Sequence, residues 1–242
     1  MSVVLPPILP LGDSLAIGWF FLCWIGYTYY ADYRRWGTRE LASVLHEYRL
    51  RWMKRLLERD NRIADVAALS SLLGSDNLFA TATLFILAGL VTILGAVDQV
   101  RDVVSDISFI AASSREIWEL KILVLIGIFV YAFFKFAWSL RQFNFSLMLV
   151  ASAPMPSDKD APDRPSFAPR AAMLVTRAVS SFNRGLRAYF FGLAALLWFI
   201  QPWAFALATI WVVLVLYRRD CRSVTLATLA DPVTDKGESR DA

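Results

Sequence analysis

Cysteine and histidine are scarce in this chain, which has 242 residues but only two cysteines and one histidine. Cys23 lies in an apolar run and Cys221 beside a basic cluster, so the two thiols cannot form a disulfide framework. With one histidine they cannot build a zinc site either, so we expect no metal site. The sequence also lacks a Gly-rich phosphate loop and a Cys-x-x-Cys motif, and no Ser-His-Asp arrangement can be placed. We therefore expect no cofactor and assign no catalytic residue.

Basic residues are absent from positions 1–11, before the first apolar run, and no small-residue cleavage site follows that run. We therefore do not expect a secretory signal peptide there. Hydrophobic residues make up 57% of the chain, well above the share in soluble domains. They occur in near-continuous runs that alternate with charged segments, as spans and loops do in a membrane protein.

The apolar runs predict an all-α polytopic membrane protein, organised as one membrane domain over residues 1–230. About five spans are expected, near residues 12–30, 78–97, 118–141, 187–200 and 203–217. Helical character continues past the third span to about residue 150, which is longer than a hydrocarbon core of about 30 Å requires. Part of this helix must project into water or lie among other helices. Residues 231–242 are polar, and we expect them to be disordered.

The last apolar stretch, residues 189–217, is interrupted at Gln201-Pro202. Proline removes a backbone donor and clashes with the preceding turn, so the chain either reverses or kinks here. A reversal gives a helical hairpin and five spans, with Trp198 and Trp203 at the outer interface. A kink gives one helix and four spans.

The distribution of Lys and Arg favours the hairpin. Residues 32–77 hold nine Lys/Arg and residues 142–187 hold six, whereas residues 98–119 hold two Lys/Arg against five Asp/Glu. Because basic loops remain in the cytoplasm, the N-terminus is expected outside and both basic segments inside. The tail from residue 218 holds five Lys/Arg, and only a hairpin brings it to the cytoplasmic side.

Two further segments are expected on the cytoplasmic side. Apolar residues recur at helical spacing between about residues 38 and 73, which predicts an amphipathic helix. This helix either lies on anionic lipid or packs on the extension of the third span near Phe143. The seven acids among the nine basic residues of the 32–77 segment favour packing. Residues 151–170 contain five prolines among Ser and Asp, which is typical of a flexible linker.

Polar residues near the inner ends of the third and fourth spans are the candidate functional site. Lys135 lies within an aromatic run at membrane depth, where an ionisable group suggests a pathway or, alternatively, a side chain that snorkels to the interface. Together with basic and amide side chains further along, it predicts a cluster suited to an anionic headgroup or phosphate. The cluster comprises Lys135, Arg141, Gln142, Asn144, Asn183, Arg184 and Arg187. The alternative is that these arginines anchor helix ends and pair with acids.

Small residues seven apart on the second span, at Ala82, Gly89 and Ala96, predict a face for close helix packing. Such a face favours a homo-oligomer. Three acids near the outer side, Asp13, Glu116 and Glu119, are explained in the main by capping of helix N-termini.

Several stretches of sequence, in the same order along residues 10–228, resemble one family. They are residues 118–121 (WELK), 131–144 (YAFFKFAWSLRQFN), 182–190 (FNRGLRAYF), and Trp198 with Pro202 ahead of residues 216–219 (LYRR). The chain resembles the domain of unknown function 599 family, multi-spanning membrane proteins of bacteria with relatives in plants. The resemblance implies the plasma membrane, which is the inner membrane for a Gram-negative source. It implies no activity.

Two functional hypotheses follow. The first is a non-enzymatic, oligomeric membrane module that acts as a channel, a carrier or a scaffold. Its expected partners are membrane lipids, further copies of the chain and a small ion or solute; the basic residues follow the topology rule, so nucleic acid is not expected. The second is an enzyme acting on a lipid or lipid-linked phosphate, which ranks lower because no nucleophile or metal is evident.

Overall fold

The computed structural model describes residues 10–33, 41–105 and 114–221, and within these ranges every regular element is a helix. The elements are α1 (Leu11–Tyr33), α2 (Leu41–Leu56), α3 (Ile63–Gly95), α4 (Val97–Ser105), α5 (Arg115–Ala151), α6 (Arg164–Leu196), the 3₁₀ turn η2 (Leu197–Phe199) and α7 (Pro202–Cys221). Three of the helices are long and apolar enough to cross a membrane: Ile63–Gly95, Arg115–Ala151 and Pro202–Asp220.

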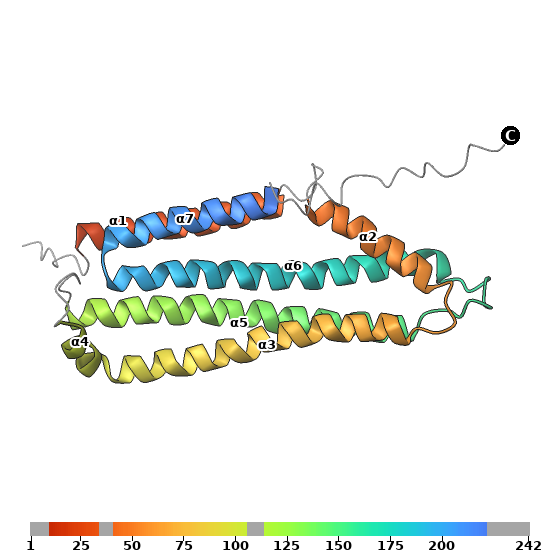
Figure 1. Cartoon of the computed structure of the whole chain (residues 1–242), viewed down its shortest axis with the longest axis horizontal. Coiled ribbons are helices and arrows are strands. Elements are labelled where there is room, and N and C mark those ends of the chain that lie inside the picture. The colour runs from red at the N-terminus through yellow and green to blue at the C-terminus, as the bar shows by residue number, and fades with distance from the viewer. Residues whose placement is uncertain (1–9, 34–40, 106–113, 222–242) are drawn as a thin grey trace, which may run out of the picture.

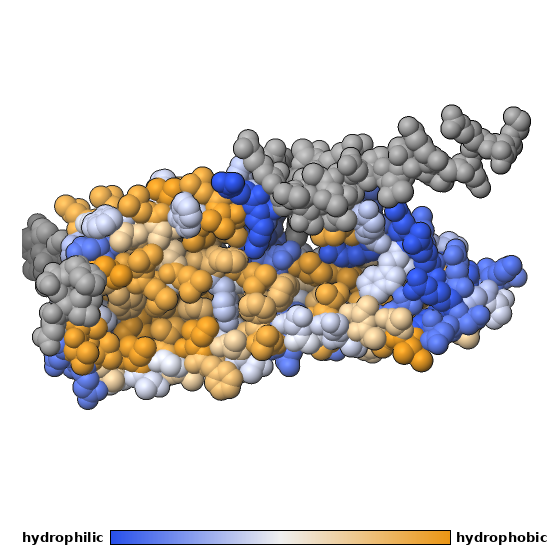
Figure 2. Space-filling model, viewed as in Figure 1, coloured by the Kyte–Doolittle hydropathy of each residue, from blue (hydrophilic) through white to orange (hydrophobic). Residues whose placement is uncertain are grey.

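The long helices lie side by side as an elongated bundle (Figure 1). Helix α5 packs between α3 and α6, while α1 and α7 pair on the other side of α6. Helix α2 packs on α6 at one end of the bundle, and α4 adjoins α5 at the opposite end. Residues of high hydropathy cover the part of the bundle that includes α1 and α7, while hydrophilic residues concentrate at the α2 end (Figure 2).

Two hydrophobic cores divide the bundle along its length. The larger core joins α1, α3, α5, α6 and α7 and is rich in aromatic rings, among them Phe20, Phe136, Phe191, Trp198 and Phe205. The smaller core joins α2, α3, α5 and α6 and contains mostly aliphatic residues, among them Met53, Leu56, Leu69, Ala172 and Val175. Helices α3, α5 and α6 therefore run through both cores, which explains their length. The predicted continuation of the third span to about residue 150 agrees with α5, which ends at Ala151.

The predicted single helix over about 38–73 is two helices in the structure. Helix α2 ends at Leu56, residues 57–62 form turns, and α3 begins at Ile63 and continues into the apolar span. The Asn61 side-chain oxygen accepts a hydrogen bond from the Ile63 amide at 2.9 Å. This local bond competes with helix continuation, and the apolar periodicity did not reveal it. Helix α2 packs, as expected, but mainly on α6 rather than on the extension of the third span.

The predicted linker over 151–170 is also shorter than expected, because α6 begins at Arg164 and already contains Pro165 and Pro169. Pro165 lies in the first turn, where proline is tolerated because the backbone amide has no intrahelical partner. Pro169 lies inside the helix, where it removes one backbone hydrogen bond without ending the helix. The Arg164 guanidinium reinforces this start by donating to the Met155 carbonyl at 2.9 Å and to the Leu57 carbonyl at 3.1 Å. The proline content alone therefore led to too long a predicted linker.

The chain reverses between α6 and α7, as the hairpin alternative predicts. Helix α6 ends at Leu196, η2 follows, and α7 starts at Pro202 and returns along α6 and α1 (Figure 1). The Tyr27 hydroxyl of α1 donates to the Asp220 carboxylate at 2.9 Å, which ties the far end of α7 to the end of α1. The basic residues at the end of α7 therefore lie at the same end of the α1–α7 pair as the C-terminal end of α1.

The glycines that pack within the chain are not the ones in the predicted stripe. A Cβ added to Gly89 would meet no atom within 4 Å, and Gly89 is exposed. A Cβ added to Gly185 would instead lie 2.6 Å from Phe136 Cε1, and one added to Gly192 would lie 3.0 Å from Phe129 Cζ. These two glycines of α6, seven residues apart, allow α5 to approach closely.

Candidate functional site

Three helices bring opposite charges together where α1 ends. Asp32 of α1 faces α6, and its Oδ2 lies 2.9 Å from Arg184 Nε while its Oδ1 lies 3.2 Å from Arg187 Nη2. Lys135 of α5 stands beside this pair and interacts electrostatically with Arg184 and Asp32. We call Asp32, Lys135, Arg184 and Arg187 the inner charge cluster, because α3, α5 and α6 continue past it along the bundle. It holds three cations and one carboxylate, so its formal charge is three minus one, or +2.

Arg187 is the most buried member of the inner charge cluster. Only 3% of the residue is exposed, whereas the side chains of Arg184 and Asp32 are 35% and 25% exposed. Its Nη2 donates to Asp32, but its Nη1 is buried without a hydrogen-bond partner. A guanidinium presents five N–H donors in a planar fork, and a buried donor left unpaired costs free energy. The cluster therefore has unused donor capacity inside the bundle.

Lys135 is half-buried and points toward the same place. Its ammonium lies 5.1 Å from the centre of the Tyr131 ring, a distance at which a cation is attracted to the face of the ring. Tyr131 itself interacts with Arg184, Arg187 and Asp32. Lys135 is therefore held among the other members of the cluster, as the predicted clustering of Lys135, Arg184 and Arg187 requires.

The remaining predicted site residues lie elsewhere. Arg141 is exposed, with its guanidinium carbon 5.6 Å from the centre of the Phe145 ring, and Asn144 is exposed as well. Gln142 is buried in the α5–α6 interface, where its Nε2 donates to Ser181 Oγ at 3.2 Å. Asn183 is half-buried on α6. The predicted site is thus divided because neighbours in sequence on α5 face different sides of that helix.

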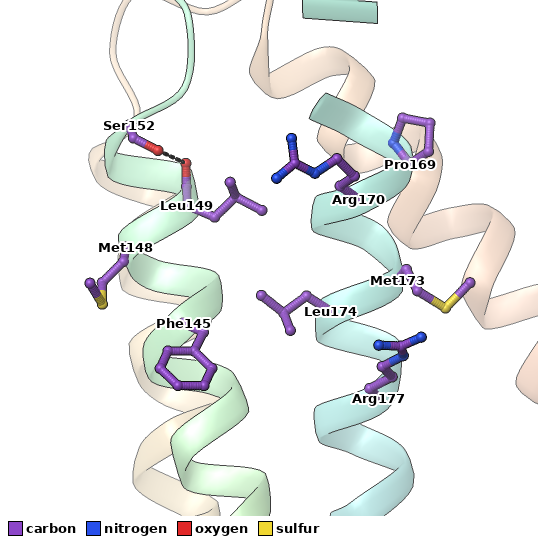
Figure 3. Close-up of a pocket in the computed structure, with 9 residues that line it drawn as sticks. All are labelled: Phe145, Met148, Leu149, Ser152, Pro169, Arg170, Met173, Leu174 and Arg177. Atoms are coloured by element: carbon purple, nitrogen blue, oxygen red, sulfur yellow. Dashed lines mark hydrogen bonds between the residues drawn. The ribbon is translucent and has the colours of Figure 1, made fainter. Parts of the chain in front are cut away.

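A groove of about 800 Å³ lies between α5 and α6 near the smaller core (Figure 3). Apolar side chains make most of its lining, and two arginines of α6 complete it. The lining residues are Phe145, Met148, Leu149, Ser152, Pro169, Arg170, Met173, Leu174 and Arg177. Leu149 and Leu174 point toward each other across the groove, and Arg170 points into it (Figure 3). The groove is separate from the inner charge cluster, with which it shares no residue.

A family model described as "Protein of unknown function, DUF599" matches residues 15–225 of the chain. The chain belongs to this family. The match agrees with the resemblance drawn from the sequence strings, and it includes every member of the inner charge cluster of this DUF599 protein. No curated protein and no solved structure matches the chain.

A second buried charge site lies at the opposite end of the larger core. Trp198 Nε1 donates to Asp13 Oδ1 at 2.6 Å, and Lys121 Nζ donates to the Trp198 carbonyl at 2.8 Å. Lys121 Nζ also lies 3.6 Å from Asp13 Oδ1. Lys121 and Trp198 are each 1% exposed and Asp13 is 6% exposed. We call these three residues the outer buried triad, because they lie at the turn between α6 and α7, at the end of the bundle away from α2.

The outer buried triad adds to two expectations. Asp13 lies in the first turn of α1, as capping requires, and its carboxylate also binds Trp198 and Lys121. Trp198 is buried within the bundle, whereas Trp203 is 65% exposed. Neither Lys121 nor Asp32 was singled out from the sequence as a site residue. A charged residue beside an apolar run was the available signal, but its partner comes from a distant helix.

The inner charge cluster has the chemistry of an oxyanion site. Arginine binds planar carboxylate or phosphate oxygens through two parallel N–H donors, and lysine adds a compact positive charge. In the parts of the chain that the structure describes, no three His, Cys, Asp or Glu side chains are grouped to hold a metal ion. The arrangement is suited to binding an anion.

Proposed function

We propose that this protein is a non-enzymatic module of the bacterial inner membrane that binds the phosphate of an anionic lipid headgroup at the inner charge cluster. The observation that carries the proposal is the buried Arg187 guanidinium, whose Nη1 has no partner within a cluster of net charge +2. An oxyanion would take up that donor and neutralise part of the excess positive charge.

The position of the cluster supports a lipid rather than a free anion as the ligand. Asp32 lies one residue before the end of α1, whose final turns carry the aromatic residues typical of a membrane interface, including Tyr29 and Tyr30. Beyond this level the bundle continues as the smaller core with the basic helix α2. The positive-inside rule assigns the basic end to the cytoplasm, which puts the cluster near the headgroups of the inner leaflet.

Arg187→Gln should reduce the anionic phospholipid that remains with the protein. Hydrogen bonds to charged groups contribute about 1.5–3 kcal/mol, so the affinity should fall by about tenfold to a hundredfold. Asp32 keeps Arg184 as its partner at 2.9 Å, so the variant should still fold. Lipid is extracted from the protein purified in mild detergent and quantified by mass spectrometry.

Arg141→Gln is the matched control, since it removes an exposed arginine of α5 that lies outside the cluster. It should retain the lipid of the wild type. Equal lipid content in wild type and Arg187→Gln would refute the headgroup proposal. Retention of inorganic phosphate without lipid would identify a free anion as the ligand, and turnover of the lipid by the wild type would favour the enzyme hypothesis instead.

The proposed topology places the N-terminus outside and the C-terminus in the cytoplasm, with five spans. Single cysteines at Gln99, Ser157 and Asp231, in a background lacking Cys23 and Cys221, would report it. We expect a membrane-impermeant maleimide to label position 99 in intact cells, and positions 157 and 231 only after the membrane is opened. Labelling of position 231 in intact cells would exclude the hairpin with a cytoplasmic tail.

We include a homo-oligomer in the proposal. Gly89 on α3 is exposed and has open space around its Cα, while Ala82 and Ala96 are half-buried. Small residues on an exposed helix face permit close contact between two transmembrane helices, which is how helices associate when lipid tails are as apolar as their side chains.

A further inference from the structure

Asp76 of α3 is a buried carboxyl group that faces no cation in the part of the chain that the structure describes. The residue is 1% exposed, and neither carboxylate oxygen has a hydrogen-bond partner. Placing an ionised carboxylate away from water is costly unless it is paired, hydrogen-bonded or neutralised. The buried carboxylate Asp65, on the same helix, shows the usual solution, since its Oδ1 accepts from Trp52 Nε1 and from Arg59 Nη1, each at 2.6 Å.

The side chain that interacts with Asp76 is Ser139 of α5. The Ser139 hydroxyl has a single proton, which it donates to the Ala178 carbonyl at 2.8 Å. That one proton can go to the Ala178 carbonyl or to Asp76 but not to both, so Ser139 satisfies at most one lone pair of the carboxyl group. Among the described residues, no charged side chain acts on Asp76. Two cations of α5 and α6 have other surroundings, since Lys135 belongs to the inner charge cluster and Arg177 lines the groove.

Gln142 adds another unpaired acceptor one turn further along the same face of α5. The Ser181 hydroxyl donates its proton to the Arg177 carbonyl at 3.1 Å, so it can only accept from Gln142. This fixes Gln142 Nε2 toward Ser181 Oγ, at 3.2 Å, and leaves Oε1 as an acceptor. Gln142 Oε1 is buried and has no partner. Gln142 Oε1 is thus a second buried acceptor without a donor, and it lies one turn of α5 from Ser139, the neighbour of Asp76.

We infer that Asp76, Ser139 and Gln142 form a buried site for a small monovalent cation, either Na⁺ or a proton. A carboxylate, an amide oxygen and a hydroxyl oxygen are the hard ligands that such cations prefer. One positive charge neutralises Asp76, and the acceptors around it supply the ligands or accept the acidic proton. The site is distinct from the inner charge cluster, which binds charge of the opposite sign.

Thermal unfolding of the full chain in detergent tests the site. At constant ionic strength, replacing choline by Na⁺ at alkaline pH should raise the unfolding temperature by about 5–10 °C when Na⁺ is about 100-fold above its Kd. If the proton is the ligand, the unfolding temperature in Na⁺-free buffer should instead fall as the pH rises, because the neutral acid is the form that the buried site favours. Whichever ligand binds, Asp76→Asn should abolish the dependence of the unfolding temperature on Na⁺ or on pH that the wild type shows.

Asp65→Asn is the control, since it alters a buried carboxyl whose partners are protein donors. It should lower the unfolding temperature but keep the dependence on Na⁺ or pH. Gln142→Leu, which removes the second acceptor without touching the carboxyl, should weaken the dependence even if Asp76→Asn fails to fold. A wild type insensitive to both Na⁺ and pH, or an Asp76→Asn variant with the wild-type response, would overturn the inference.

Discussion

Gly185→Ala is expected to destabilise the protein, although alanine is a better helix former than glycine. The new Cβ would lie 2.6 Å from Phe136 Cε1, well inside van der Waals contact. The Phe136 ring is fully buried, with ring centres of Phe79, Phe182 and Tyr189 between 5.5 and 5.7 Å away, so it has little room to move. Overpacking costs about 1–3 kcal/mol, against a gain in helix propensity of about 1 kcal/mol.

The expected result is an unfolding temperature several degrees below that of the wild type, at about 2–4 °C for each kcal/mol. Phe136→Leu should partly rescue Gly185→Ala, because the smaller side chain leaves space for the methyl group. The combined change should therefore be smaller than the sum of the two single changes, as expected for residues in contact. If the two changes in unfolding temperature simply add, or if Gly185→Ala is as stable as the wild type, then α5 and α6 do not approach as described.

Gly89 of α3 provides the control for Gly185→Ala. Because a Cβ there meets nothing within 4 Å, Gly89→Ala should leave the unfolding temperature unchanged or raise it slightly. Gly89→Leu carries a larger side chain onto the same exposed face. It should lower the oligomeric mass in mild detergent, measured by light scattering, if α3 forms the interface between copies. An unchanged mass would remove Gly89 from that interface.

Lys121→Met is expected to cause the largest loss of stability among single changes at charged residues. It leaves the Asp13 carboxylate, 6% exposed, without its cation in the larger core. Breaking a buried ion pair by removing one partner costs about 3–5 kcal/mol. The change also removes the hydrogen bond to the Trp198 carbonyl that holds the turn between α6 and α7.

Adding Asp13→Asn to Lys121→Met should recover part of that loss, since no uncompensated charge then remains. The asparagine side-chain oxygen can still accept from Trp198 Nε1, which preserves the link between α1 and the turn. Thermal unfolding of wild type, both single variants and the double variant gives the coupling free energy. A double variant less stable than Lys121→Met would contradict the assignment of a buried ion pair.

Helix extents along the apolar parts of the chain were predictable, because hydrophobic run length and charge asymmetry are properties of the sequence itself. The extent of α5 and the reversal near Gln201-Pro202 are both examples. The break between α2 and α3 was not predicted, because apolar spacing does not report local turns such as those over residues 57–62, where the Asn61 side-chain oxygen accepts from the Ile63 amide. The early start of α6 was missed because proline was weighed by composition rather than by its position in the first turn.

The candidate site was predicted only in part. Lys135, Arg184 and Arg187 were grouped because each lies near the end of an apolar run, and the structure places them close together. Their partner Asp32 was missed, and Arg141 was included, because spacing along α5 does not say which side of the helix meets α1 and α6. The same ambiguity explains why the stripe at Gly89 was predicted to pack while the close contact is at Gly185.

The most direct test of the central claim is an experimental structure of the protein in a bilayer disc that contains anionic phospholipid. We predict a phosphate within hydrogen-bonding distance of Arg187 Nη1 and beside Lys135, with the acyl chains along α1 and α5 in the bilayer. A structure in which Arg187 Nη1 binds only protein groups or water, with no headgroup in the inner charge cluster, would contradict the account.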